Sequence, residues 1–173
     1  MGTQIQKLHI QDSEWGEYPG CNEMLTLSAP DKISFIHRAY LEAGANVIET
    51  NTFGANRIVL SEYGLEERTR EINEATAQLA VYERDQYINR DPSKGPVYVA
   101  GSLGPGTKLP SLGQANFDTV YTSYYQQAYG LIEGEQSFLS SKHHKTFCKS
   151  RRQSWQSRTP QLRSSWTYRS SYP

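Results

Sequence analysis

Two short segments of the sequence place polar or glycine residues directly after an apolar run, as happens where a strand ends at a binding site. The first is Glu49-Thr50-Asn51-Thr52-Phe53-Gly54, and the second is Gly101-Ser102-Leu103-Gly104-Pro105-Gly106. The first would aim hydroxyl and amide groups at a ligand. In the second, glycines let backbone N–H groups approach a ligand closely, and Pro105 limits the freedom of the loop. Both segments are therefore candidate parts of one binding site.

Each segment also has a purely structural interpretation. Asn51 and Thr52 would serve equally well as caps of the following helix, because short polar side chains accept hydrogen bonds from its first N–H groups. The glycine segment would serve equally well as a tight turn between a strand and a helix. It also resembles a phosphate-binding P-loop, but Thr107 precedes Lys108 where that motif needs lysine first, which excludes a P-loop.

Two further groups lie near the end of the chain. His143, His144 and Cys148 have side chains that bind metals, but a fourth ligand and an organised scaffold are missing, which favours an accidental cluster. The basic and aromatic residues that follow could bind nucleic acid through phosphate charge and base stacking. Basic tails without a specific target are commoner, so nucleic acid is a secondary hypothesis for the partner.

Alternating helices and strands would bring the two binding segments together. Pro30 opens and Gly44 closes an amphipathic helix, which leads at once into a short apolar strand. The pattern predicts strands over 46–50 and 96–100, and helices over 30–44, 55–63, 65–87 and 117–134. This alternation indicates an α/β fold with a parallel sheet, whose active site lies at the carboxyl ends of the strands. In the last helix, we expect the inner face to hold Val120, Tyr124, Ala128, Leu131 and Ile132.

The alternation is expected to stop at Gly134. Residues 1–134 hold 10 Lys/Arg and 17 Asp/Glu, whereas residues 135–173 hold 8 Lys/Arg and Glu135 as their single acid. The second segment is rich in Ser and Arg and lacks the aliphatic content of a core. We therefore expect one acidic domain over 1–134, followed by an irregular or disordered basic tail.

Composition also limits the cellular setting. No stretch approaches the roughly 20 apolar residues that span a bilayer, and polar residues follow Met1 where a signal peptide would have its apolar core. Cys21 and Cys148 are far apart and give no sign of a disulfide framework. These features predict a cytoplasmic protein with no membrane partner.

Several motifs of residues 1–134, in order, resemble the start of the homocysteine methyltransferase module of the cobalamin-dependent methionine synthases. They are Met1-Gly2-Thr3, GCNEMLTLSAPDKI, HRAYLEAGANVIETNTFGAN, YGLEERTREINEA and GSLGPGTKLPSLG. GCNEMLTLSAP and GPGTKLPSLG favour this family over the simpler homocysteine methyltransferases that use other methyl donors. Those enzymes share the AGAN and TNT patterns, and a fragment of one of them remains an alternative.

The resemblance implies a (β/α)8 barrel in which three cysteine thiolates hold zinc, and zinc keeps the homocysteine sulfur as the reactive thiolate. It implies cobalamin as the methyl carrier, and folate and cobalamin modules as partners in the full-length protein. It also implies that five residues line the homocysteine pocket, namely Asn51, Thr52, Ser102, Leu103 and Gly104.

The departures from the family pattern concern the chemistry itself. The family opens with Asp-Gly-Ala-Met-Gly-Thr, and this chain begins at the Met of that motif, so we expect the first strand and its Asp to be missing. Neither Cys21 nor Cys148 matches a zinc position, and two thiols cannot make a three-thiolate site. A complete barrel needs eight strands and about 250 residues. We therefore expect a partial barrel that is inactive by itself, with no catalytic or metal-binding residue and no bound cofactor.

The tail has a specific explanation. After GLIEG the family continues with a buried strand and a Glu-Thr-x-x-Asp motif, whereas this chain reads EQSFLSSKHHKTFCK. Back-translated with permitted codons and shifted by one base, the same nucleotides can spell Gly-Ala-Glu-Phe-Phe-Ile-Ile-Glu-Thr-Ser-Gln-Asp-Phe-Leu-Gln-Ile-Lys. This alternative contains the strand, the acidic motif and the start of a helix. We therefore predict a frameshift just after Gly134, which would make the composition of 135–173 a by-product.

Overall fold

The computed structural model describes residues 1–135, 137–141 and 148–149 of the 173-residue chain. Short helices occupy its first part and lead to one longer helix: α1 (Gly2–Lys7), α2 (Asp12–Trp15), a 3-10 turn (Asn22–Met24), α3 (Leu25–Ser28) and α4 (Pro30–Glu42). Pro30 begins α4 as predicted, because its fixed φ suits the first turn of a helix. The chain then turns at Gly44, whose φ of 89° requires glycine, and enters the sheet.

The sheet has the order β1-β2-β3-β4 among the described residues. The strands are β1 (Val47–Glu49), β2 (Tyr98–Leu103), β3 (Phe138–Ser141) and β4 (Cys148–Lys149). β2 runs parallel to both of its neighbours, with Val47 opposite Tyr98 and Ala100 opposite Phe138. β4 runs antiparallel to β3. The carboxyl ends of β1 and β2 therefore meet at one edge, as the sequence predicted.

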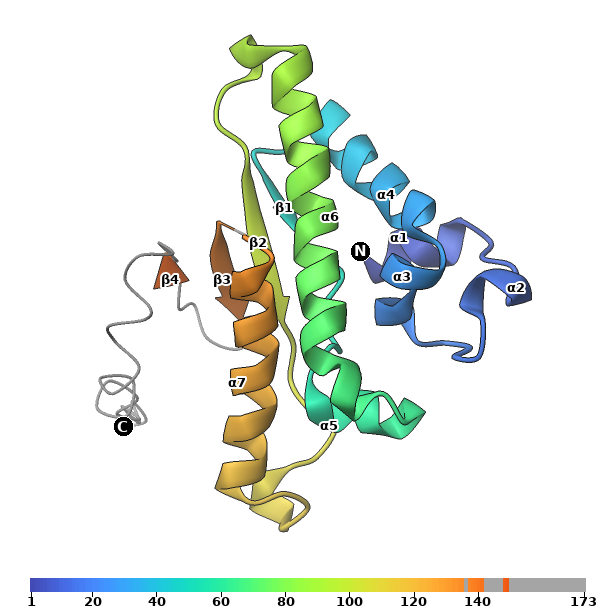
Figure 1. Ribbon diagram of the computed structural model, residues 1–173, viewed down its shortest axis with the longest axis vertical. Coiled ribbons are helices and arrows are strands. Elements are labelled where there is room, and N and C mark those ends of the chain that lie inside the picture. The colour runs from blue at the N-terminus through green and yellow to red at the C-terminus, as the bar shows by residue number, and fades with distance from the viewer. Residues whose placement is uncertain (136, 142–147, 150–173) are drawn as a thin grey trace.

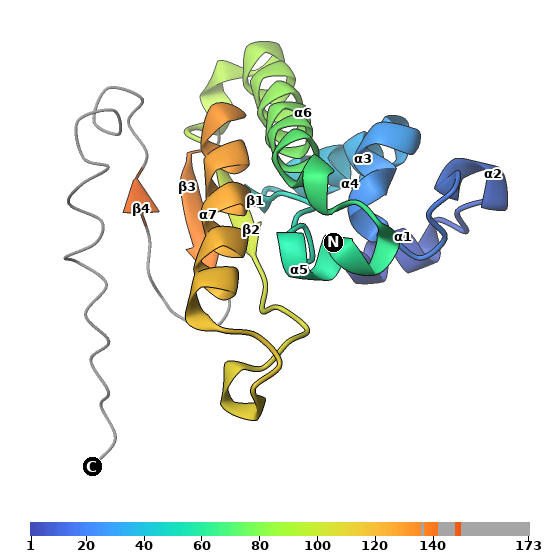
Figure 2. The ribbon, with the colours of Figure 1, turned by 60° about the horizontal axis from the view of Figure 1, so that its bottom comes forward.

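Between the strands lie α5 (Arg57–Leu60), α6 (Thr69–Arg90) and α7 (Phe117–Glu133), together with the 3-10 turns Ser61–Tyr63, Glu66–Arg68, Pro92–Lys94 and Pro110–Leu112. The long helices α6 and α7 lie side by side along the sheet, with α4 on the other side of α6 (Figures 1 and 2). One core cluster lies between these layers and combines apolar residues of α4, α6, β1 and β2 with Val97, which directly precedes β2: Leu41, Ile48, Ala80, Tyr87, Val97 and Val99. The other face of the sheet is open at Val47 and Tyr98, which are register partners and 45% and 46% exposed.

Two glycines let α7 approach α6 closely. A Cβ at Gly130 would lie 2.6 Å from the Arg70 carbonyl oxygen, and one at Gly134 would lie 2.4 Å from the Ala77 Cβ. Both distances are far inside van der Waals contact. The separation of the two helices therefore depends on having no side chain at these positions.

The structure corrects three sequence-based expectations. β2 continues through Leu103, because pairing with β3 carries it three residues past the predicted end at Ala100. The alternation also continues beyond Gly134, where we expected it to stop, since β3 extends the parallel sheet. The fully buried face of α7 is rotated from the predicted one: Leu131 is buried as expected, but its companions are Ser123, Gln127 and Gly130.

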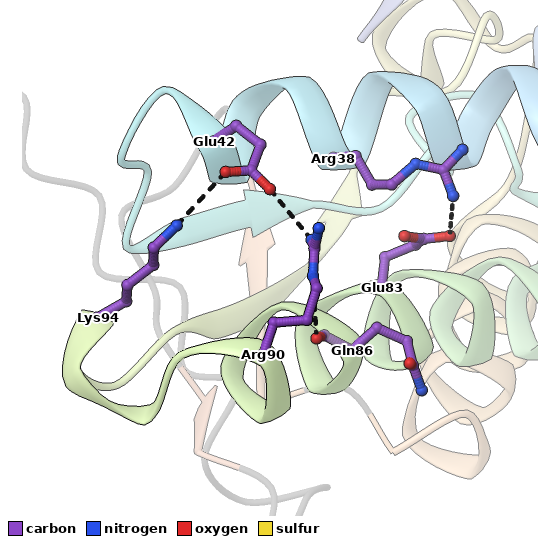
Figure 3. Close-up of polar contacts among 6 residues, drawn as sticks. All are labelled: Arg38, Glu42, Glu83, Gln86, Arg90 and Lys94. Carbon is purple, nitrogen blue, oxygen red and sulfur yellow. Dashed lines mark hydrogen bonds and ion pairs between the residues drawn. The ribbon is translucent and has the colours of Figure 1, made fainter.

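Ion pairs join α4, α6 and the turn before β2 (Figure 3). Glu42, near the start of β1, pairs with Arg90 at 3.1 Å and with Lys94 at 3.4 Å. Farther along the helices, Arg38 lies 3.2 Å from the carboxylate of Glu83, whose side chain is only 3% exposed. The amino ends of the strands are thus surrounded by charged pairs.

Candidate functional site

The carboxyl ends of β1 and β2 are joined by hydroxyl groups instead of charges. The backbone N–H of Ser102 donates to Thr50 Oγ1 at 2.9 Å, and Thr52 Oγ1 donates to the Ser102 carbonyl oxygen at 2.8 Å. The two threonine oxygens lie 2.6 Å apart. All three residues are at most 2% exposed, so water does not compete for these bonds. The two candidate segments are therefore fastened to each other side by side.

The 3-10 turn Asn22–Met24 closes over the first segment. The side-chain amide of Asn51 donates to the Asn22 carbonyl oxygen at 2.7 Å, and the Gly54 N–H donates to Glu23 Oε1 at 2.8 Å. A Cβ at Gly54 would lie 2.7 Å from that same carboxylate oxygen. The turn thus fixes the first segment from the side away from β2.

Helix α7 contacts both segments through hydrogen bonds from its side chains. Gln127, which is fully buried, donates from Nε2 to the Thr52 carbonyl oxygen at 2.7 Å. One turn earlier, the hydroxyl of Tyr124 donates to the Gly104 carbonyl oxygen at 2.9 Å. One helix therefore makes a hydrogen bond to each strand end.

Gly104 is a position where the two segments leave no room for a side chain. Its N–H donates to the Phe53 carbonyl oxygen at 3.0 Å. A Cβ at this position would lie 2.3 Å from that oxygen and 2.8 Å from the Phe53 ring. Glycine is therefore required at position 104, because the backbone of the first segment lies too close to leave room for a side chain.

The five predicted pocket residues occupy one edge of the sheet. Asn51, Thr52, Ser102 and Gly104 are buried, and Leu103 is half-buried. The capping interpretation of Asn51 and Thr52 is wrong, because the side chain of Asn56 caps α5 by accepting from the Val59 N–H at 3.1 Å. The glycine-segment alternative is wrong in part, since Gly101, Ser102 and Leu103 belong to β2 and not to a turn.

Sequence reasoning missed several residues that organise this edge. Thr50 belongs to the first segment and Glu23 to the motif GCNEM, but the sequence assigned neither residue a role. Ser123 and Gln127 lie one helical turn apart on the buried face of α7, and Ser123 Oγ accepts from the Ile58 N–H at 3.2 Å. A pair of polar residues four positions apart in a helix that otherwise reads as amphipathic was the signal that could have identified them.

The electrostatics of the site disfavour charge. Burial raises the pKa of Glu23 above its ordinary value, against the opposing effect of hydrogen bonds from its own backbone and that of Gly54. Burial also raises the pKa of Cys21 to about 11, helped by the nearby charge of Glu23. Cys21 is 1% exposed and packs among Met24, Ala55 and Leu60. A thiol in such surroundings stays protonated near neutral pH and does not suit a metal.

The described part of the chain contains no cluster of three or more His, Cys, Asp or Glu side chains that could hold a metal ion. His143 and His144 lie outside the described residues, and of Cys148 only the backbone position in β4 is described. The aromatic and basic residues of 150–173 lie outside them as well. Among the described helices, none has the length and apolar character that crossing a membrane requires.

The sequence has relatives among the methionine synthases. It is 38% identical over 134 residues to the methionine synthase of Mycobacterium leprae and, over the same length, to that of Mycobacterium tuberculosis. Each match covers 78% of this chain and 11% of the other protein, so the chain spans about a tenth of the relatives it matches.

The fold has solved relatives. The metallated form of the homocysteine methyltransferase MmuM from Escherichia coli superposes with a TM-score of 0.66 over 82% of this chain and 50% of that one. Its apo form gives a TM-score of 0.59 over 80% and 45%. Sequence identities of 21% and 20% make these likenesses evidence for the α/β fold alone.

The family model for homocysteine S-methyltransferases matches residues 1–142. That match includes both strand ends, the turn Asn22–Met24, all of α7 and β3. It covers most of the chain, and the chain therefore belongs to the homocysteine S-methyltransferase family.

Proposed function

We propose that this chain is part of a methionine synthase, and that it supplies one portion of the pocket that holds homocysteine for methylation to methionine. The observation that supports this most directly is the convergence of two family motifs on one edge of the sheet. There, Thr50 and Thr52 from the TNT segment bind the backbone of Ser102 in the glycine segment. The proposed architecture is the first units of a (β/α)8 barrel.

In this proposal, the pocket is lined by Asn51, Thr52, Ser102, Leu103 and Gly104. Backbone and amide groups at the end of a parallel strand suit the polar end of an amino acid, because they supply directed hydrogen bonds without a buried net charge. The low polarity implied by the raised pKa of Glu23 would strengthen such bonds. These residues bind and orient homocysteine, and the chemistry at sulfur belongs elsewhere.

Zinc does not fit the residues present. The family chemistry needs three thiolates, and the chain has two cysteines, of which Cys21 is buried with a pKa of about 11. We propose that this chain by itself neither binds zinc at a catalytic site nor turns over. Zinc, cobalamin and the folate-binding module would belong to other parts of a complete enzyme.

A chimera tests the pocket assignment. Residues 1–134 would replace the matching segment of the Mycobacterium tuberculosis methionine synthase, and homocysteine-dependent methionine formation would be measured. We expect an active chimera in which Asn51→Ala raises the KM for homocysteine about tenfold, the effect of one lost hydrogen bond. Asn89→Ala is the matched control. Asn89 is exposed at the end of α6, far from the carboxyl ends of the strands, so its substitution should leave KM unchanged.

Two outcomes would contradict the proposal. A folded chimera that no longer binds homocysteine would show that these strand ends do not form its pocket. Stoichiometric zinc and methionine production by the purified 173-residue chain would overturn its proposed inactivity. The nucleotide sequence around codon 134 tests the frameshift, since codons incompatible with the shifted strand and acidic motif would remove it.

One alternative is a fragment of a homocysteine methyltransferase that uses another methyl donor. It differs from the proposed methionine synthase fragment only in that donor. The 38% identity to methionine synthases supports the donor proposed above. Nucleic-acid binding rests on the basic tail 135–173, most of which lies outside the described part of the chain, and no observation favours it.

A further inference from the structure

The hydroxyl groups between β1 and β2 form a closed ring of hydrogen bonds whose direction follows from counting protons. Thr52 has one hydroxyl proton, and it lies on the bond to the Ser102 carbonyl oxygen. Thr52 can therefore only accept in its 2.6 Å contact with Thr50, so Thr50 is the donor there. Thr50 in turn accepts from the Ser102 N–H. The ring starts at the N–H of Ser102 and returns to the carbonyl of the same residue.

We propose that Thr50 and Thr52 are positioning residues that fix the backbone of Ser102 in the homocysteine pocket through this ring. The inference rests on the proposed function and changes one part of it. The only proton of the Thr52 hydroxyl lies on a bond within the ring, and Thr52 is 0% exposed, so it acts on the substrate through Ser102 instead of touching the substrate itself. Thr50, which the family resemblance did not assign to the pocket, has the same role.

The geometry makes the ring a rigid unit. All three members are at most 2% exposed, and each bond polarises the next, because every hydroxyl both accepts and donates. Both backbone groups of Ser102 bind threonine side chains, which locks the orientation of its two peptide planes. Gln127 then fixes the ring from outside by donating to the Thr52 carbonyl oxygen. The backbone groups of Ser102 are engaged within the ring, so a ligand at this strand end would meet the neighbouring parts of two peptide planes whose orientation is already fixed.

The test uses NMR on the full 173-residue chain. In the unchanged chain we expect slowly exchanging hydroxyl protons for Thr50 and Thr52, and a protected Ser102 amide. Thr50→Val removes the acceptor of that amide at nearly constant volume, and its exchange should accelerate about tenfold. Thr52 does not bind the Ser102 amide directly, yet Thr52→Val should accelerate the exchange of that amide, because Thr50 loses the acceptor that orients its hydroxyl.

Three further variants make the result specific. Thr50→Ser and Thr52→Ser keep the hydroxyl and should restore slow exchange of the Ser102 amide. The double Val variant should exchange little faster than the worse single variant, since either change opens the ring. Thr76→Val is the control: Thr76 is equally buried and hydrogen-bonded within α6, so it should lower stability without affecting Ser102.

A titration with homocysteine, followed by the same amide signals, separates the two proposals. We expect binding to the unchanged chain that weakens about tenfold in either Val variant and recovers in the Ser variants. Equal binding by Val and unchanged chains would overturn the positioning role. Absence of binding to the unchanged chain would overturn the proposed function and the pocket role of the ring together. Independently of homocysteine, the ring itself is overturned if Thr52→Val leaves the Ser102 amide unchanged, or if no slow hydroxyl protons are found.

Discussion

The two ends of the parallel strands are stabilised by different chemistry. At the amino ends, Glu42 holds two cations on the surface, and Arg38 reaches from a half-exposed position to the buried carboxylate of Glu83. At the carboxyl ends, neutral hydroxyl, amide and backbone groups bind each other, and the carboxylate of Glu23 accepts from a backbone N–H. Charges join α4 to α6 and to the turn before β2 at one end, and uncharged bonds join the two candidate segments at the other.

This difference has a physical reason. Exposed ion pairs tolerate side-chain movement and contribute little energy, so they suit an end where only approximate packing is needed. Buried neutral bonds cost far more to break, and each has one favourable geometry. A site that must present backbone groups in fixed directions is therefore built from the second kind.

Gly104→Ala should have the largest effect. Its Cβ would lie 2.3 Å from the Phe53 carbonyl oxygen, so the two segments must separate and their mutual hydrogen bond must break. We expect a loss of about 3 kcal/mol in the free energy of unfolding, measured by urea denaturation. Gly106→Ala is the matched control in the same loop, because its nearest neighbour, Ile58 Cδ1, is at an ordinary contact distance of 3.8 Å. Equal losses in both variants would show that the loop tolerates no side chain at all, and that close approach is not the cause.

Arg38→Met should have an intermediate effect at the charged end. It leaves the carboxylate of Glu83, 3% exposed, without its cation, and we expect a loss of about 2 kcal/mol in the free energy of unfolding. Arg90→Met removes a cation from Glu42, which is 49% exposed and keeps Lys94, so we expect less than about 0.5 kcal/mol. Thermal unfolding at low and high salt measures both. A larger loss for Arg90→Met would contradict the ranking by burial.

Glu23→Gln should have the smallest effect, and its sign depends on pH. Because the folded chain raises the pKa of Glu23, it binds the proton more tightly than the unfolded chain does. The stability from the neutral carboxyl is fully present below the ordinary pKa of 4.5 and is lost as pH rises through the raised value. Glutamine keeps an acceptor for the Gly54 N–H without a charge. The variant should therefore be slightly more stable than the unchanged chain at neutral pH.

The unfolding free energies of the two chains should converge as the pH falls toward 4.5. The measurement is a series of urea titrations between neutral and acidic pH. A gap that widens on acidification would mean that the charged carboxylate stabilises the fold, contrary to the effect expected from the burial of Glu23.

The long helices α4, α6 and α7 and the first strand could be predicted because their signals are local. Pro30 marks the start of α4, and Gly64, in the left-handed conformation, separates two helical stretches at the predicted position. The end of β2 could not be predicted from its own residues, since the strand is prolonged by pairing with β3. The same holds for β3 itself, whose partner lies 38 positions earlier in the chain, as with Phe138 and Ala100.

The candidate site could be located from the sequence, but its internal organisation could not. Asn51, Thr52 and Ser102 lie where strand-end reasoning put them. The contacts that hold them come from Asn22, Thr50 and Gln127, up to 75 residues away in the chain from the groups they bind. Such partnerships depend on how two helices and a turn pack around the strands. The sequence predicts that a polar residue on the buried side of α7 has a hydrogen-bond partner, but it does not identify that partner.

The small residues between α6 and α7 affect the candidate site, although they lie in the layer of helices outside the sheet. Gly130 comes three positions after Gln127, whose amide must reach the Thr52 carbonyl across 2.7 Å. Any side chain at 130 would push the helix outward and withdraw that amide, although no group near a ligand would have changed. The geometry of this strand end can thus be altered from a distance, through the thickness of a helix interface.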